Sequence, residues 1–320
     1  MSELGERMRR DFAVVVPAFN EAPVIQDLVR ELREAFERHH LDGEVLLVDD
    51  GSTDGTAEIA EREASGWPGF RVLRHAANRG KTEAMTTAAA ATDRSYLVLF
   101  DADLQHLPDE IPRFLAKLEE GWDIVTGRKI GHYDKRAVSS AYNRLSHKIF
   151  QVPVSDLNSM KAFRRDVLED IQLRHDWHRF FVVLAHARGA SVTEIDIDLH
   201  PRRAGTSKFQ GPFRILVGLF DLVSVWFLLL FSRKPLLLFG GSGLVLALLG
   251  VLVALITTYF RFVHPMLGFE HYIPPMGYRP LLYLVMLLET LGFVLVGFGL
   301  VSEQVAQVRD ELEAIRRREH

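Results

Sequence analysis

Two aspartates, one residue apart, follow a short apolar run near the middle of the chain, within Leu97–Pro108. Carboxylate oxygens suit hard divalent cations such as Mg²⁺ and Mn²⁺, which keep coordination positions for water and substrate phosphates. If the run is a buried strand, Asp101 and Asp103 share one face at its carboxyl end, with Gln105 as a further oxygen donor close behind. The spacing therefore predicts a metal site. The alternative is an acidic loop that caps the following helix.

Apolar runs alternating with segments of helical periodicity predict the elements that position these side chains. The strands are expected over 12–17, 44–48, 70–74, 97–100, 123–126 and 192–198. Asn20 is expected to cap the first helix, with Pro23 near its first turn. Such β-α alternation is typical of an α/β fold with a mostly parallel sheet, right-handed crossovers and helices on both faces.

Polar clusters follow the first four expected strands, at Phe19–Glu21, Asp49–Ser52, Asn78–Lys81 and Asp101–Gln105. Ligands of parallel sheets bind outside the carboxyl ends of the strands, where all four clusters fall. Each cluster alone could be a helix cap, but together they favour a binding site at this edge.

The chain after the fifth strand supplies further cations. A helix is expected over Lys135–Phe150, a turn at Asp156 and a second helix over Trp177–Ala190. The last strand leads into a cationic loop, His200–Phe209. Such a loop is often only a solvated surface, but its place just before an apolar region favours an anion site.

Two uncharged or nearly uncharged runs predict membrane spans, at Leu236–Tyr259 and Pro280–Val301, the second of which contains Glu289. Each is long enough to cross a hydrocarbon core of about 30 Å; buried core helices are the alternative. Segment 213–232 is expected to form helices at the membrane surface. Basic residues flank the outer ends of the two runs, which places both termini in the cytoplasm. Glu303–His320 is expected to be a charged helix, and homo-oligomer formation through it is left open.

Composition narrows the class of protein. The chain has 320 residues, a formal net charge of −4 and no cysteine. Disulfides and thiolate metal sites are thereby excluded, and nothing indicates nucleic-acid binding. The first residues lack an apolar core of signal-peptide length, so the catalytic part is expected in the cytoplasm. There is no GxxxxGK[ST] loop and no GxGxxG after the first strand, which argues against a P-loop ATPase and a dinucleotide oxidoreductase.

The motifs VVVPAFNEA, VLLVDDGSTDGT and FDADLQHLP, in this order, resemble the N-terminal half of family-2 inverting glycosyltransferases with the Rossmann-like GT-A fold. VTGRK, KRAVSSAYN, SDLNSMKAF and RRAGTSKF resemble more narrowly the polyprenyl-phosphate glycosyltransferases, which include dolichyl-phosphate mannose synthase and bacterial undecaprenyl-phosphate glycosyltransferases. The resemblance covers about residues 11–305. It implies a catalytic domain over 1–210, juxtamembrane amphipathic helices over 211–234, two transmembrane helices over 235–302 and a cytoplasmic tail over 303–320.

The resemblance also implies a role for individual residues. The donor nucleotide is expected to contact Pro17, Phe19, Glu21, Asp49, Asp50, Ser52, Lys81, Asp101 and Ala102. The Mg²⁺ or Mn²⁺ ion is expected on Asp101, Asp103 and Gln105. The acceptor phosphate is expected on Arg128, Arg136, Ser140, Arg202 and Lys208, with Lys135 and Ser139 fitting nearly as well as Arg136 and Ser140. Asp156 and Asp103 are the expected catalytic residues.

The implied reaction is an inverting transfer of a glucose- or mannose-type hexose from a UDP- or GDP-linked sugar to undecaprenyl or dolichyl phosphate at the cell inner membrane. A phosphate nucleophile is already anionic near neutral pH, so Asp156 is expected to orient substrate rather than to remove a proton. A glycosidase is disfavoured because Asp101 and Asp103 are too close to straddle a glycosidic bond. The chain lacks the QxxRW motif of processive polysaccharide synthases. A transferase acting on another lipid or glycan acceptor and a non-catalytic membrane scaffold remain alternatives.

Overall fold

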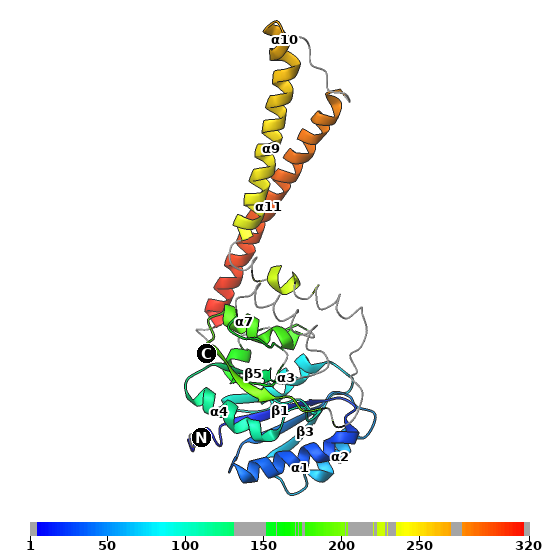
Figure 1. Cartoon of the computed structure of the whole chain (residues 1–320), viewed down its shortest axis with the longest axis vertical. Helices are drawn as coiled ribbons and strands as arrows, with labels where there is room; N and C mark the ends of the chain where they lie inside the picture. Colours follow the sequence, from blue (N-terminus) through cyan, green and yellow to red (C-terminus); the bar gives the residue numbers. More distant parts are fainter. Residues whose placement is uncertain are drawn as a thin grey trace. The chain divides into compact units, whose positions relative to one another are not determined.

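The computed structural model describes residues 5–130, 152–157, 159–169, 171, 173–174, 177–201, 203, 220, 223–227, 229, 235–269 and 277–316. The chain divides into two compact units, Met1–Leu222 and Val223–His320. The first contains a sheet covered by helices, and the second contains a helical hairpin (Figure 1).

The sheet of the first unit has seven strands among the described residues, in the order β3-β2-β1-β4-β6-β5-β7. The strands are β1 (Phe12–Ala18), β2 (Glu44–Asp49), β3 (Phe70–Arg74), β4 (Tyr96–Leu99), β5 (Ile124–Ile130), β6 (Lys161–Arg164) and β7 (Val192–Asp198). All neighbouring strands run parallel except β6, which is antiparallel to both β4 and β5. The expected mostly parallel α/β fold is confirmed.

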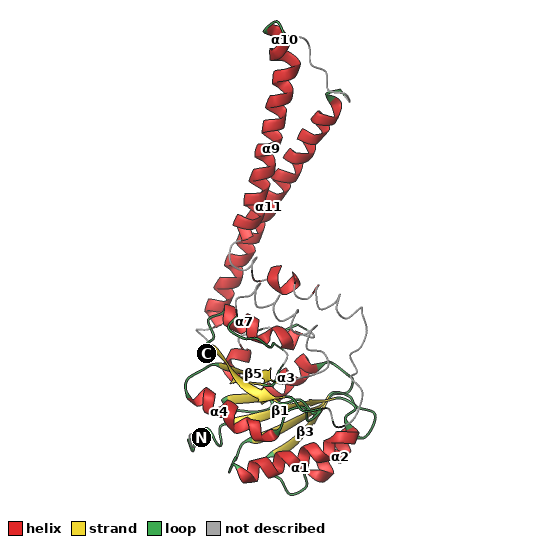
Figure 2. Cartoon of the chain, in the orientation of Figure 1, coloured by secondary structure: helices red, strands yellow, loops and turns green. Residues whose placement is uncertain are grey.

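Helices cover both faces of this sheet (Figure 2). They are α1 (Ala22–Arg38), α2 (Thr56–Glu63), α3 (Lys81–Ala90), α4 (Ile111–Glu119), α6 (Arg165–Glu169) and α7 (Phe181–Ala187), with the short 3₁₀ helices η1 (Pro108–Glu110) and η2 (Trp177–Phe180). On one face, apolar residues of α1 and α4 such as Leu28 and Phe114 pack with Val14, Val16 and Val98 of the central strands. On the other, α3 buries three alanines and a methionine, and such small side chains let the helix approach the sheet closely.

Two local predictions are wrong, and one strand was not predicted. Asn20 does not cap α1: it has a left-handed backbone (φ +51°), and its side chain instead accepts a hydrogen bond from the Thr53 backbone. Strand β4 ends at Leu99, so a turn rather than strand alternation carries Asp101 and Asp103. The short strand β6 was not expected, because its four residues include a lysine and an arginine and show no clear alternation.

Other predicted helices are confirmed only in part. The helix expected over Trp177–Ala190 is divided into η2 and α7 and ends at Ala187. The helix expected over 135–150 lies outside the described residues. Of the segment 213–232, residues 220, 223–227 and 229 are described, and these are helical.

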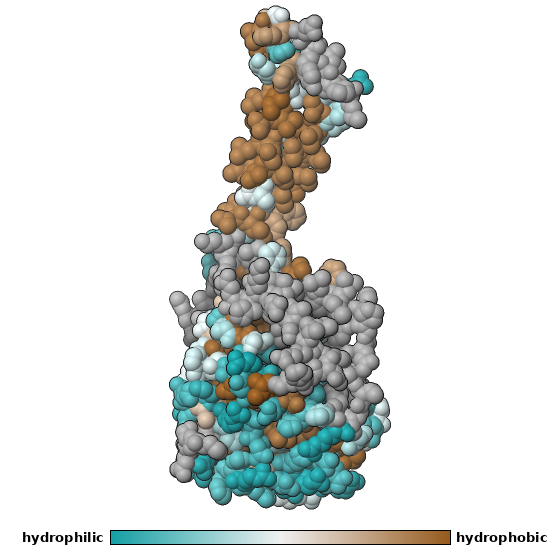
Figure 3. All heavy atoms as spheres, viewed as in Figure 1, coloured by the Kyte–Doolittle hydropathy of each residue, from teal (hydrophilic) through white to brown (hydrophobic). Residues whose placement is uncertain are grey.

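The second unit is a hairpin of two long helices, whose middle parts show an apolar surface (Figure 3). Its first arm comprises the π-helix η3 (Leu236–Gly240), α9 (Gly241–Thr258), the π-helix η4 (Tyr259–Val263) and α10 (His264–Met266), and its second is α11 (Arg279–Arg316). Leu236–Met266 and Arg279–Val308 are long and apolar enough to cross a membrane. The first arm thus extends beyond the expected end at Tyr259, because the aromatic residues after it continue the helix. The tail is helical as far as Arg316, as expected.

Glycines set the contact between the two arms. A side chain at Gly292 would meet the Gly243 carbonyl oxygen at 2.8 Å, and one at Gly299 would meet the Gly240 backbone at the same distance. Gly250 leaves room for the Glu289 carboxyl, which would lie 2.7 Å from an added Cβ. Small residues at these positions let the two backbones approach, as is common between helices in membranes.

Candidate active site

The loops after β1 and β2 are joined by hydrogen bonds at the carboxyl edge of the sheet. The Asn20 backbone N–H donates to Ser52 Oγ at 2.8 Å, and the Glu21 N–H donates to Thr56 Oγ1 at 2.9 Å. In return, Asn20 Oδ1 accepts the Thr53 N–H at 2.8 Å. The side chains of the expected nucleotide-binding stretch therefore hold its two loops to each other. Phe19 and Glu21 lie half-buried on the first of them.

Asp50 connects this pair of loops to the loop before α3. Its buried carboxylate accepts the N–H groups of Arg79 and Gly80 at 2.8 and 2.7 Å and contacts His75 Nδ1 at 2.7 Å. The next residue, Gly51, has φ +75°, and a Cβ there would lie 2.6 Å from the Ala77 backbone. His75 was not predicted as part of the site, since it lies at the end of a strand without a motif. Asp50 thus positions the Asn78–Lys81 cluster.

Lys81 and Asp101 form an ion pair at the centre of the edge. Burial by itself raises the pKa of Asp101, but the Lys81 ammonium more than offsets this and holds that pKa well below its usual range. Asp101 is therefore an ionised carboxylate at neutral pH. Lys81 opens α3, directly after Gly80, whose φ of +89° brings the chain into the helix.

The turn after Asp101 brings its polar residues against the end of β7. Asp103 Oδ1 accepts the Gln105 N–H at 3.2 Å, and the buried Leu104 between them takes a left-handed backbone, φ +52°. The Gln105 carbonyl accepts the His200 N–H at 2.9 Å, and Gln105 Nε2 donates to the His200 carbonyl at 3.5 Å. These contacts fix the Gln105 amide, whose oxygen is the expected metal ligand. Ala102 is buried in this turn, and Pro17 is half-buried at the end of β1.

The buried His106 and the half-buried His178 lie near the ion pair and were missed at the sequence level. Burial, with a further contribution from Lys129, lowers the pKa of His106 to about 4. Burial and the positive charges of Lys81 and Lys161 lower the pKa of His178 well below its usual range. Both are neutral at pH 7. The His178 N–H donates to Thr82 Oγ1 at 3.1 Å, which ties the start of η2 to α3.

Asp156, an expected catalytic residue, lies buried beside two lysines that were not predicted. Its Oδ2 is 3.4 Å from Lys129 Nζ, and its backbone N–H donates to Glu194 Oε1 at 3.3 Å. Lys161, the first residue of β6, is 1% exposed and donates to the Leu157 carbonyl at 3.1 Å. Burial, reinforced by Lys81, lowers the pKa of Lys161 to about 7, although Asp101 and Asp156 oppose the shift. Because β6 runs antiparallel, its first residue lies at the same edge as the carboxyl ends of its neighbours.

The expected acceptor-phosphate residues are only partly described. Arg128, on β5, makes a two-point ion pair with Asp196 of β7, with Nε–Oδ1 at 2.6 Å and Nη2–Oδ2 at 3.0 Å. Arg136, Ser140, Arg202 and Lys208 lie outside the described residues, as do Lys135 and Ser139. In the cationic loop, Arg203 forms an ion pair with Glu31 of α1.

The oxygen donors fit a small divalent cation that is also held by substrate phosphates. Within the described residues no three His, Cys, Asp or Glu side chains form a metal-binding cluster. Asp101 and Asp103 provide two carboxylates and Gln105 an amide in one turn, all with hard oxygens. A Mg²⁺ ion at a phosphate site needs only one or two carboxylates, because water and substrate complete its shell. The donor set therefore suits such an ion.

The model of the family described as "Glycosyl transferase family 2" matches residues 13–188. An undecaprenyl-phosphate 4-deoxy-4-formamido-L-arabinose transferase from Pseudomonas savastanoi pv. phaseolicola is 30% identical over 94% of this chain and 87% of its own. A dodecaprenyl-phosphate galacturonate synthase from Rhizobium johnstonii is 29% identical over 93% of this chain and 88% of its own.

Among solved structures, glucosyl-3-phosphoglycerate synthase from Mycobacterium tuberculosis, in complex with Mn²⁺, UDP and its product, superposes with a TM-score of 0.55. It covers 69% of this chain and 80% of its own at 19% identity, so the likeness concerns the fold. The same enzyme in complex with Mg²⁺ and UDP gives a TM-score of 0.53 at 19% identity, over 67% of this chain and 79% of its own.

Proposed function

Because the chain belongs to glycosyl transferase family 2, we propose that it transfers a sugar from a nucleotide-diphosphate sugar to a polyprenyl phosphate. The observation that carries this proposal is the similarity over 94% of the chain to a protein named as an undecaprenyl-phosphate sugar transferase. Family membership makes the chain a glycosyltransferase with the GT-A fold, as predicted. Two apolar helices and lipid-specific relatives support membrane association.

We assign the donor nucleotide to the joined loops after β1 and β2 and to the turn after β4. Its contacts would come from Pro17, Phe19, Glu21, Asp49, Asp50, Ser52, Lys81, Asp101 and Ala102. Asp50 already accepts three hydrogen bonds from the loop before α3, so it acts here mainly by positioning Lys81. Phe19 offers a flat apolar surface on which a base can stack.

Asp101, Asp103 and Gln105 would hold Mg²⁺ or Mn²⁺, as the metal-bound structural neighbours suggest. An ion held by these residues would neutralise negative charge on the departing nucleoside diphosphate. Lys81, in contact with Asp101, supplies a second positive charge near the same phosphates.

In the proposed reaction an oxygen of the lipid phosphate attacks the anomeric carbon of the sugar. The bond from that carbon to the nucleoside diphosphate breaks as the new bond forms, and the configuration inverts. Asp156 would orient the sugar or the acceptor; its carboxylate is paired with Lys129, near the end of β5. The acceptor phosphate would be bound by Arg128, Arg136, Ser140, Arg202 and Lys208, of which Arg128 first has to exchange Asp196 for phosphate.

The proposal also concerns the identity of the transferred sugar and of the donor nucleotide. We propose a glucose- or mannose-type hexose on UDP or GDP, as in the transferases that the motifs resemble, whereas the named relatives use a modified arabinose and galacturonate. We further propose that the protein lies in the inner membrane, with the catalytic domain over 1–210 in the cytoplasm and two transmembrane helices over 235–302. The distribution of basic residues supports this arrangement.

The test is to incubate purified full-length protein with undecaprenyl phosphate and a panel of nucleotide sugars, including uronic and aminoarabinose types, with and without Mn²⁺. A lipid-linked sugar that appears only with the metal supports the proposal. Asp103→Asn removes a proposed metal ligand and should lower turnover at least about a hundredfold, with unchanged membrane insertion as control. A protein that binds nucleotide sugar yet transfers to no polyprenyl phosphate would favour another acceptor or a scaffold.

A further inference from the structure

The segment Ser155–Leu157, which carries Asp156, has no regular secondary structure. Its backbone groups therefore need partners other than those of a helix or a strand. Asp156 and Leu157 are only 5% and 3% exposed, so water has little access to them. The partners come instead from two charged side chains of the sheet, Glu194 of β7 and Lys161 of β6. Neither residue was predicted from the sequence.

The Glu194 carboxylate holds the start of this segment. Its Oε1 accepts the backbone N–H of Ser155 and also that of Asp156, the latter at 3.3 Å. The Ser155 hydroxyl donates to the second oxygen, Oε2, at 2.7 Å. Two successive residues thus donate to a single carboxylate, and hydrogen bonds to a charged acceptor are stronger than those between neutral groups.

Lys161 holds the end of the segment. Its Nζ donates to the Leu157 carbonyl oxygen at 3.1 Å, and the lysine is 1% exposed. Burial of an amine costs free energy that such a contact partly offsets. A lysine side chain can donate to a carbonyl whether it is charged or neutral, so this contact does not depend on the pKa of Lys161.

The sheet sets the distance between these two side chains. Thr126 of β5 is the register partner of both Lys161 and Glu194. Residues that are partners across neighbouring strands point to the same face. Lys161 and Glu194 therefore stand in one row, two strand spacings or roughly 10 Å apart. About three residues of extended chain span that distance, which matches the length of the segment between them.

We propose that Glu194 and Lys161 are positioning residues, which together clamp the backbone on either side of Asp156. Glu194 fixes the chain where it enters this residue, and Lys161 fixes it one residue after. The Asp156 carboxylate is thereby kept beside Lys129, 3.4 Å from its Nζ, at the edge where the substrates would bind. The role of the clamp in catalysis rests on the proposed function, whereas its contacts do not.

Amide hydrogen exchange of the full-length protein in lipid nanodiscs tests the clamp without any substrate. In Glu194→Ala, peptides that contain Ser155 and Asp156 should exchange at least about fivefold faster, because both N–H groups lose their acceptor. Glu194→Gln keeps an acceptor oxygen and should change the rate by less than about twofold. Asp196→Ala removes a carboxylate two residues along the same strand, and as the matched control it should leave this rate unchanged. Unchanged exchange in Glu194→Ala, or equal acceleration in Asp196→Ala, would overturn the proposal.

A double-mutant cycle with Asp156 tests the role in the reaction. For sugar transfer, Glu194→Ala and Lys161→Met should each lower kcat roughly tenfold, with the KM for nucleotide sugar changed by less than about twofold. Glu194→Gln should restore most of the kcat. In the Asp156→Asn background, either clamp variant should lower kcat by less than about twofold more, because residues that act through one group are not additive.

A full tenfold loss in the Asp156→Asn background would mean that Glu194 and Lys161 act by another route, which would contradict the proposal. If the native protein transfers no sugar to any polyprenyl phosphate, the proposed function fails. The exchange rates still decide whether the clamp exists, so the two failures are distinguishable.

Discussion

Individual charged residues at the sheet edge are paired with one another, and a substrate that binds there has to compete with these partners. Arg128 is the clearest example, because its guanidinium is held at two points by the Asp196 carboxylate. The Arg128–Asp196 pair is half-exposed, so little free energy is needed to replace the Asp196 carboxylate with a phosphate as the partner of Arg128.

This pairing predicts opposite effects for its two members. Arg128→Ala should raise the KM for polyprenyl phosphate by about three- to tenfold, because a phosphate-binding cation is lost. Asp196→Asn should lower that KM by a few fold, because the guanidinium is released from its partner. The measurement is steady-state transfer at saturating nucleotide sugar. If both variants raise the KM equally, the pair has only a structural role.

The lowered pKa of Lys161 predicts that the free energy of unfolding depends on pH. Its pKa is about 7 in the folded protein, against 10.5 for an unperturbed lysine, so between these values the unfolded chain binds one proton more than the folded one. Stability attributable to this residue therefore rises with pH over that range, by at most about 1.4 kcal/mol per pH unit.

The thermal midpoint of the native protein, relative to that of Lys161→Met, should accordingly increase from pH 7 to pH 9. Lys117→Met, on the exposed side of α4, provides the control, and its difference from the native protein should stay constant with pH. If the thermal midpoints of the native protein and of Lys161→Met change with pH in parallel, the Lys161 ammonium stays protonated in the folded state.

Sequence reasoning identified Asp101, Asp103 and Gln105 because their side-chain chemistry and spacing are local properties. The same kind of pattern did not identify Lys129, His178 and Lys161, because only the folded sheet brings these residues to the same edge. Lys161 in particular is buried by the pairing of β6 with strands distant in sequence. No local pattern distinguishes such a lysine from a surface one.

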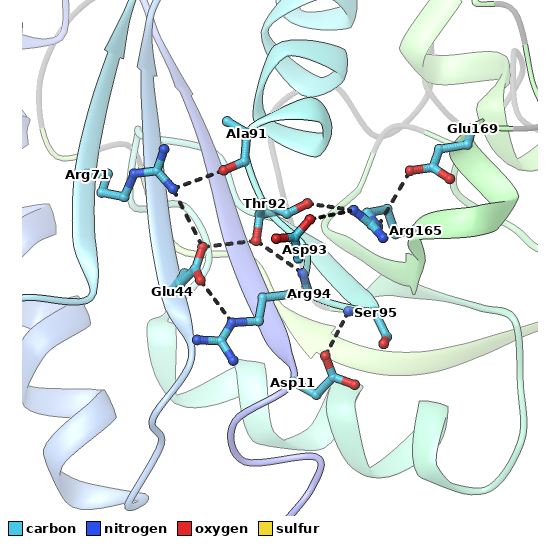
Figure 4. Close-up of polar contacts among 10 residues, drawn as sticks. All are labelled: Asp11, Glu44, Arg71, Ala91, Thr92, Asp93, Arg94, Ser95, Arg165 and Glu169. Carbon is cyan, nitrogen blue, oxygen red and sulfur yellow. Dashed lines mark hydrogen bonds and ion pairs between the residues drawn. The ribbon is translucent and has the colours of Figure 1, made fainter.

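Among the elements, the turn between α3 and β4 is held at the amino edge of the sheet by an ion-pair network around Glu44 (Figure 4). The Glu44 carboxylate at the start of β2 accepts hydrogen bonds from Arg94 Nε and Thr92 Oγ1, both at 2.9 Å. Arg71 of β3 donates to the Ala91 carbonyl at 2.9 Å, and Arg165 donates to that of Thr92 at 2.6 Å. The network thus fixes where the strand that carries the acidic turn begins.

Glu44→Gln should therefore lower the stability of the first unit by about 1 kcal/mol, since the charged acceptor of two donors is lost. For a domain of this size, the thermal midpoint would fall by about 2–4 °C. Glu120→Gln, in an exposed pair with Lys117, is the matched control and should change the midpoint by less than about 1 °C. Sugar transfer by Glu44→Gln at low temperature should be unchanged, because the network lies at the edge opposite the site.

The parallel strands were predictable because apolar runs ending in polar clusters are continuous in the sequence. Strand β6 was not, since Lys161–Arg164 pairs antiparallel between two strands and draws its burial from them. The turn after β4 was also misjudged: Phe100 continues the apolar run, but the regular strand ends one residue earlier.

At the scale of the whole molecule, the two units differ in composition as the sequence indicates, with charge concentrated in the α/β unit and in the tail of α11. The spans were predictable from apolar length, whereas their ends were not. Arg261 is a charged residue within η4, where its guanidinium lies over the rings of Phe262 and Tyr278, and the helix continues past it.

This division predicts the behaviour of a fragment ending at Leu222, the boundary of the first unit. It should retain binding of the nucleotide sugar, measured calorimetrically, within about threefold of the full chain. Its transfer to undecaprenyl phosphate in vesicles should fall at least about tenfold, because membrane attachment raises the local concentration of lipid acceptor. Unchanged transfer to vesicle-bound acceptor would mean that the helical hairpin is dispensable.

The reversed direction of β6 has a consequence for the connection that leads into it. Strand β5 ends at Ile130 and β6 begins at Lys161, and both points lie at the same rim of the sheet. The chain between these two strands therefore leaves the sheet and returns to it at one rim. A change in the length of this connection would leave the pairing of β4, β5 and β6 unchanged, because both of its ends lie at that rim.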